Sequence, residues 1–123
     1  ETLHHVASAD NIWWQRLHLK ERVDPLAEET NSDFGRLGNE YLKMADRWVQ
    51  WIESATEQKL LHVIEYRNSK REAFKQPVFE ILLHVFNHQT YHHGQIITML
   101  RQQEIDKLPS TDFSTFTRTK KKY

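Results

Sequence analysis

Four of the eight histidines of this chain lie within ten positions, in the stretch LLHVFNHQTYHHGQ, residues 82–95. On a helix, side chains four residues apart lie one above the other on the same face, so His88 and His92 have the spacing of two imidazoles that hold one metal ion. The chain has no cysteine, which leaves imidazole and carboxylate groups as the metal ligands. This spacing therefore predicts a metal site that includes His88 and His92.

The other histidines of the stretch have weaker claims to the same ion. His84 lies two helical turns from His92, about 12 Å along the axis at about 1.5 Å per residue, so these two cannot share one metal. His93 points about 100° away from His92. The helical wheel favours His88 with His92, and leaves His84 and Gln95 at the margin as hydrogen-bond partners that orient a ligand ring. The string HQTYH lacks the glutamate of helix-borne metalloprotease sites, which excludes that activity.

A reading without metal stays open at this point. A single histidine on an apolar helix face is most often a hydrogen-bonded core residue. Two stacked histidines are harder to bury, because each neutral ring has a donor and an acceptor to satisfy. The remaining alternative is a helical interaction module in which the pair is a coincidence.

A bundle site needs ligands from a second helix, and the segment LHHVASAD near the N-terminus offers them. The wheel places His5 nearer the apolar side than His4, although the preference is weak. Asp10 lies within the apolar stripe of this segment, where a carboxylate must be paired or coordinating unless it caps the helix or lies at its edge. For His18 and His62 we expect surface roles.

Apolar periodicity predicts three helices and a hairpin to carry these residues. The first helix spans about residues 3–19, a connection of residues 21–35 ends in a cap at Asn31, Ser32 or Asp33, and a second helix carries a stripe over residues 37–55. Two short runs, residues 62–66 and 73–77, suit a hairpin around a polar turn. A third helix, the longest, begins near Pro77 and runs to Gln103, and Pro109 excludes any helix after it.

Composition limits the classes of function. The 123 residues are 38% hydrophobic and fit one domain, residues 1–118, followed by a basic tail at residues 119–123. Zero net charge argues against nucleic acid as a partner. No apolar run approaches the roughly 20 residues that cross a bilayer, so we expect a soluble, cytoplasmic protein without membrane contact. The chain opens with Glu1 rather than methionine, so an N-terminal segment, with any targeting signal, can precede it.

The segments HHVASADNIWWQRL, LLHVFNHQTYHHGQIITMLRQ and LPSTDF together resemble the DinB family of the DinB/YfiT superfamily. The resemblance extends over nearly the whole chain, and NHQTYHHGQ makes it specific. It implies an all-α, up-down helical bundle with a small β-hairpin insert, and a divalent metal held by three histidines. Matched position by position, these ligands are His5, His88 and His92.

The chain departs from the family pattern at several positions. His93 stands where the family usually has arginine, Lys70 and Arg71 stand near an expected hairpin glycine, and Glu104 replaces a common helix-ending glycine. Three helices are visible, and the family's additional N-terminal helix is absent from this sequence. Either residues before Glu1 or a partner chain must cover the face of that helix, and we expect a homodimer, which family members often form.

The resemblance implies a metal-dependent enzyme, a transferase or hydrolase, and the superfamily includes thiol-dependent S-transferases. A small-molecule substrate or a low-molecular-weight thiol would then be the partner. Tyr91, Gln95 and Asp10 are the candidates for proton transfer or orientation. Zinc and nickel are the favoured metals, with iron, manganese and copper as alternatives. The competing function is a metal site without turnover that stabilises the bundle, and such a site is usually closed by four protein ligands.

Overall fold

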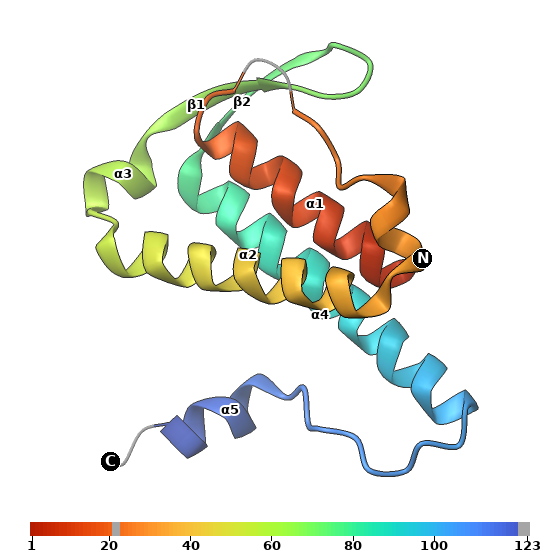
Figure 1. Ribbon diagram of the computed structural model, residues 1–123. Coiled ribbons are helices and arrows are strands. Elements are labelled where there is room, and N and C mark those ends of the chain that lie inside the picture. The colour runs from red at the N-terminus through yellow and green to blue at the C-terminus, as the bar shows by residue number, and fades with distance from the viewer. Residues whose placement is uncertain (21–22, 121–123) are drawn as a thin grey trace.

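The computed structural model describes residues 1–20 and 23–120 and contains three long helices, a two-stranded sheet and short helical segments (Figure 1). This architecture confirms the predicted helical bundle with a hairpin insert. In chain order the elements are α1 (Thr2–Leu17), η1 (Glu28–Ser32), α2 (Phe34–Ser54), α3 (Glu57–Leu61), β1 (Val63–Arg67), β2 (Ala73–Pro77), α4 (Val78–Gln102) and α5 (Phe113–Lys120).

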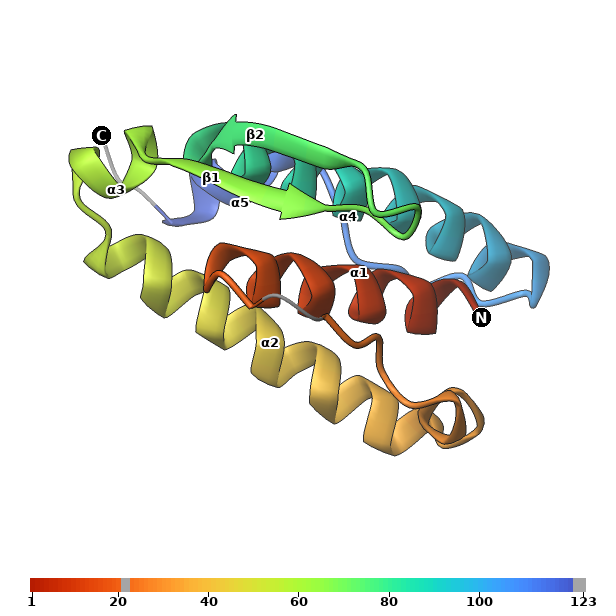
Figure 2. The ribbon, with the colours of Figure 1, turned by 90° about the horizontal axis from the view of Figure 1, so that it is seen from above.

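Helix α1 packs against both α2 and α4, and the hairpin lies alongside α4 and α1, on the side away from α2 (Figure 2). Trp48 of α2 and Ile81 and Val85 of α4 are almost fully buried at the centre. Burying a large apolar side chain contributes about 1.5–3 kcal/mol to the stability of the folded chain. The core cluster joins all three helices and β1, and comprises Leu17, Met44, Trp48, Ile64, Val78, Ile81, Leu82 and Val85.

The boundaries of α2 and α4 follow from local chemistry. Asp33 caps α2 by accepting a hydrogen bond from the backbone N–H of Arg36 at 3.0 Å, as one of the predicted alternatives. The strands pair antiparallel with Val63 opposite Pro77. Directly after the pair, the N–H of Val78 donates to the carbonyl of His62 at 2.9 Å. The hairpin therefore fixes the start of α4, the helix that carries the histidine pair.

Two turns adopt the left-handed conformation at the positions where the resemblance led us to expect glycine. Arg71 in the hairpin turn has φ 63° and Glu104 after α4 has φ 61°. A side chain with a Cβ is strained there by about 1–2 kcal/mol relative to glycine. Leu19, after α1, adopts the same conformation with φ 58°. The sequence departures at Arg71 and Glu104 thus change the side chain and leave the turn in place.

The prediction that Pro109 excludes any further helix is wrong. Helix α4 does end at Gln102, before Pro109, but α5 begins four residues after the proline. The Asp112 carboxylate accepts hydrogen bonds from the backbone N–H and the hydroxyl of Thr115, so it starts a new helix. Thr119 and Lys120 of the predicted basic tail belong to α5, and residues 121–123 lie outside the described residues. The short helix α3 was not predicted either, and Thr56 caps it by accepting from the N–H of Lys59.

Among the described residues, we find no helix with the length and apolar character that crossing a membrane requires.

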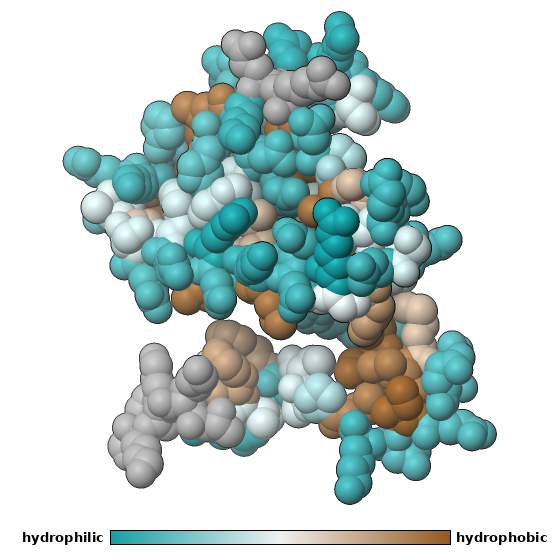
Figure 3. Space-filling model, viewed as in Figure 1, coloured by the Kyte–Doolittle hydropathy of each residue, from teal (hydrophilic) through white to brown (hydrophobic). Residues whose placement is uncertain are grey.

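Apolar side chains remain exposed on α2 and on α4. Leu42 and Val49 of α2 are 63% and 53% exposed, and Leu83 of α4 is 60% exposed. Figure 3 shows apolar residues along the lower edge of the bundle and on the C-terminal segment that turns back beneath it. Contiguous exposed apolar surface is uncommon on soluble monomers and marks contact surfaces.

We propose that a second copy of the chain covers part of this exposed apolar surface, as the expected homodimer requires. Sedimentation velocity at micromolar concentration should show a dimer. Val49→Lys should shift the chain toward monomer, because it places a charge in the apolar surface. The same substitution at the exposed polar position Gln50 is the control. A stable monomer of the unsubstituted chain at this concentration would contradict the proposal.

Candidate metal centre

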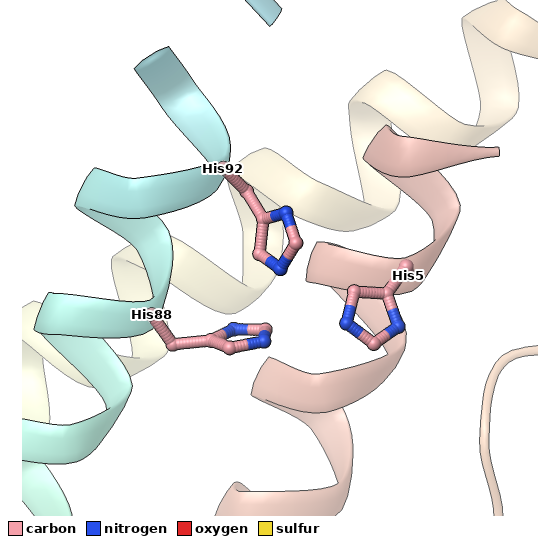
Figure 4. A group of neighbouring side chains, drawn as sticks. All are labelled: His5, His88 and His92. Carbon is pink, nitrogen blue, oxygen red and sulfur yellow. The ribbon is translucent and has the colours of Figure 1, made fainter. Parts of the chain in front are cut away.

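Three histidines that are far apart in the sequence converge at one side of the α1–α4 contact. His5 comes from the first turns of α1, and His88 and His92 come from successive turns of α4 (Figure 4). One ring nitrogen from each can be chosen so that all three lie within 4.8 Å of one another. The ring centroids of His88 and His92 are 4.5 Å apart, and that of His5 lies 5.2 Å and 4.9 Å from them. This group could hold a metal ion.

The donor set fits a divalent ion with little movement. A tetrahedral ion about 2.1 Å from each nitrogen holds those nitrogens roughly 3.4 Å apart, so the rings need to approach by about an ångström or slightly more. His5 is exposed, whereas His88 and His92 are half-buried. The three rings therefore form a group that is open to solvent on the side of α1.

Gln95 orients one of the three rings. The Nδ1 of His92 lies 2.6 Å from the side-chain oxygen of Gln95, one turn further along α4. An amide oxygen only accepts hydrogen bonds, so Nδ1 carries the proton and Nε2 keeps its lone pair. This tautomer is the one in which Nε2 can coordinate a metal. The margin position of Gln95 on the helical wheel is consistent with this contact.

The environment of His88 favours its neutral form. Burial lowers the pKa of His88, and the neighbouring rings of His92, His5 and His84 lower it further. A neutral imidazole is the form that binds a metal, so these neighbours favour the competent state near neutral pH.

The remaining histidines lie outside this group. The ring of His84 meets the ring of Trp13 at 5.1 Å and lies 5.9 Å from His88, so it extends the row of rings along α4. Tyr91 is 65% exposed, with its ring 5.0 Å from that of His92. His4 contacts the carbonyl of Ala27 at 3.2 Å, His18 contacts that of Trp14 at 2.8 Å, and His62 is exposed just before β1.

Asp10 is buried on the opposite side of α1 from solvent, with 1% of its surface exposed. Its carboxylate accepts a hydrogen bond from Nε2 of Gln89 at 2.8 Å, so it is a paired core residue rather than a misplaced edge residue. Burial raises its pKa to about 6, against the opposing effect of the Gln89 hydrogen bond. In the part of the chain that the structure describes, Asp10 does not belong to the group of converging ligand atoms.

A second buried polar contact links α2 to α4. The hydroxyl of Tyr41 lies 2.6 Å from Nε2 of His93, the residue after His92. Burial raises the pKa of Tyr41 to about 12, with the nearby Asp10 charge as a smaller cause, and burial also lowers the pKa of His93. No periodic pattern in the sequence indicated the roles of Gln89 and Tyr41. A tyrosine within an apolar stripe is a usable signal, because its hydroxyl needs a partner when buried.

Comparison with known proteins agrees with this architecture. The model of the DinB family matches residues 1–118. Protein DinB of Bacillus subtilis strain 168 is 30% identical over 121 residues, which cover 93% of this chain and 69% of that protein. No solved structure matches the chain significantly.

The buried carboxyl of Asp10 predicts an unusual dependence of stability on pH. Its folded-state pKa of about 6 lies above the ordinary value of 3.8, so the folded state is favoured at low pH and loses stability as pH rises from about 4 through 6. The loss is up to about 3 kcal/mol. In urea unfolding with a chelator present, Asp10→Asn should gain stability over the unsubstituted chain across this range. Asp46→Asn, at an exposed position of α2, is the control. Parallel curves for the unsubstituted chain and Asp10→Asn would contradict the prediction.

Gln95→Leu should weaken metal binding without weakening the fold. Loss of the partner of Nδ1 frees the His92 ring to rotate and change tautomer, an effect of about 10- to 100-fold on metal affinity. Gln95 is exposed, so the free energy of unfolding without metal should stay the same. Competition with a chromophoric chelator measures the affinity, and Gln102→Leu in the same helix is the control. Equal affinities for Gln95→Leu and the unsubstituted chain would exclude this role.

Proposed function

The chain belongs to the DinB family, and from this membership and its three converging imidazoles we propose that it binds one divalent metal ion through His5, His88 and His92. The observation that carries the proposal is the approach of three ring nitrogens from two helices to within 4.8 Å of one another. Three imidazoles suit zinc or nickel best among the metals considered, with iron, manganese and copper as alternatives.

We further propose that the site is catalytic, as a transferase of the thiol-dependent type or a hydrolase. Three protein ligands leave at least one coordination position open, whereas a structural site is usually closed by four. The exposure of His5 leaves this side accessible to a small molecule. When bound, a divalent ion in such a site lowers the pKa of a coordinated water or thiol so that it is deprotonated near neutral pH.

The chain's own residues would contribute orientation and proton transfer. Gln95 holds the ring of His92, and the exposed Tyr91 lies beside that ring, where its hydroxyl can meet a substrate. Asp10 reaches α4 through Gln89, the neighbour of His88. Its place in the core supports a positioning role better than direct contact with substrate. A low-molecular-weight thiol or another small molecule would be the partner.

The alternative is a metal-binding bundle without turnover. The number of protein ligands decides between a closed and an open site, and Asp10 is the one carboxylate in α1 that could supply a fourth. Its hydrogen bond to Gln89 argues against that role.

Metal content tests the proposal directly. The chain, purified without a metal-affinity column, should contain about one ion per molecule by mass spectrometry, because three convergent imidazoles give strong binding. His92→Ala should lose it. His4→Ala is the matched control, because His4 neighbours His5 on α1 but contacts the Ala27 carbonyl. Absence of metal in both the unsubstituted chain and His4→Ala would favour a metal-free interaction module.

Cobalt-substituted protein then separates the open site from the closed one. Addition of a small thiol to an open site should produce a sulfur-to-cobalt charge-transfer band and change the ligand-field spectrum. A spectrum that no thiol alters would exclude thiol-dependent transfer.

A further inference from the structure

A second site lies at the other end of α1, on the side of the hairpin. A cavity there is bounded by the last turns of α1, by described residues of the segment that follows it, by β1 and by the hairpin turn. Figure 1 shows this end of α1 next to the hairpin. It lies far from the candidate metal centre, because the eleven helical steps from His5 to Arg16 span about 16 Å at about 1.5 Å per residue. Its described lining residues are Ile12, Arg16, Leu19, Lys20, Val23, Pro25, Glu65, Tyr66, Arg67, Asn68, Ser69 and Arg71.

The described lining is strongly basic. Arg16, Lys20, Arg67 and Arg71 line the cavity, and Glu65 is the one acidic side chain among its described lining residues. The whole chain has zero net charge, so this concentration of cations is local. Low-dielectric walls around charges of one sign strengthen their attraction for a counter-ion.

Arg16 is a half-buried cation for which the described residues supply no acidic partner. Its guanidinium carbon lies 4.5 Å from the ring centre of Trp13 and 5.2 Å from that of Tyr66. Its Nη2 donates to the carbonyl of Arg67 at 3.2 Å, and its buried Nε has no hydrogen-bond partner. Burial lowers the pKa of Arg16, and no carboxylate among the described residues opposes this effect. Buried charges are normally paired, but no described residue supplies a counter-charge for this guanidinium.

Main-chain groups take part in the hydrogen bonds of the other basic residues of the cavity. Nη1 of Arg67 donates to the carbonyl of Arg71 at 2.8 Å, so a main-chain group rather than a carboxylate holds this second guanidinium. Arg71 is in the left-handed conformation, which glycine would adopt without strain. The last carbonyls of α1 accept hydrogen bonds from the N–H groups of Leu19 and Lys20, which reduces the negative potential at that helix end.

We propose that this cavity binds a small molecule through an oxyanion group, a carboxylate or a phosphate, with Arg16 and Arg71 as its main cationic contacts. The Arg16 guanidinium lies against the rings of Trp13 and Tyr66. A guanidinium forms paired hydrogen bonds with planar carboxylate or with phosphate oxygens. The site is independent of the proposed metal centre, because none of its residues is one of the three histidines.

Titration with inorganic phosphate and, separately, with succinate tests the proposal on the full chain, both as purified and after removal of metal with a chelator. The Nε–H resonance of Arg16 in nitrogen-15 spectra, identified by its loss in Arg16→Met, reports binding at this residue. Calorimetry gives the affinity of each variant. We expect saturable binding of at least one probe, with the Arg16 resonance shifting at the same concentrations. The preferred probe distinguishes a phosphate ligand from a carboxylate ligand.

Three variants make the outcome decisive. Arg16→Met should weaken binding about tenfold or more, the effect of losing charge-assisted hydrogen bonds. Arg71→Gly removes a cation and relieves the backbone, so it should weaken binding several-fold with an unchanged or raised melting temperature, and it remains informative if Arg16→Met unfolds. Arg47→Met, at an exposed position of α2, should bind as the unsubstituted chain does. No saturable binding of either probe, or equal weakening by Arg47→Met, would overturn the proposal. We expect the same binding before and after removal of metal, so failure of the proposed metal centre would not change this outcome.

Discussion

The contact between α1 and α4 is the constraint on which the candidate metal centre depends. The two histidines of α4 have their spacing from the helix itself, but the third comes from a helix some eighty residues earlier in the chain. Its approach requires a fixed register between α1 and α4. Apolar packing around Leu17, Ile81 and Val85 holds the helices together, yet apolar contacts alone tolerate small shifts along the helix axes. The hydrogen bond from Gln89 to Asp10 is directional and crosses the same contact close to the histidines.

This polar contact explains why a carboxylate occupies the interior of the bundle. Burial of Asp10 disfavours its charged form, as its raised pKa shows, so it does not serve stability at neutral pH. Tyr41 and His93 form a second, partly buried polar contact between α2 and α4. Together these residues connect α4 to both neighbouring helices through groups that bond in few geometries. Buried polar groups of this kind select one packing arrangement at some expense of stability.

Sequence patterns identified the elements that have regular periods. Four-and-three spacing of apolar residues located the three long helices, and the polar turn between two short β-rich runs located the hairpin. The same periodicity placed Gln95 beside the His88 and His92 side of α4, where it contacts His92. It did not choose strongly between His4 and His5, because that choice depends on how α1 is rotated against α4. It also said nothing of the Gln89 to Asp10 or Tyr41 to His93 contacts, since a pairing between distant segments leaves no periodic trace in either one. Helix α5 departs from the prediction because a proline prevents the continuation of the helix before it and not the start of a new one, and Asp112, three residues after Pro109, provides the new cap.

Trp13 lies between the candidate metal centre near the start of α1 and the proposed oxyanion site near its end. One side of its indole meets the ring of His84, which adjoins His88, and its face meets the guanidinium of Arg16. Its ring also packs against Tyr66 of β1. Tyr66, Trp13 and His84 thus form a continuous series of ring contacts from the hairpin to α4. Because α4 begins directly at the end of β2, the hairpin is connected to α4 in two ways, through the backbone at Val78 and through the aromatic contacts of Trp13. The hairpin is thus a structural element of both sites, although it supplies no candidate metal ligand.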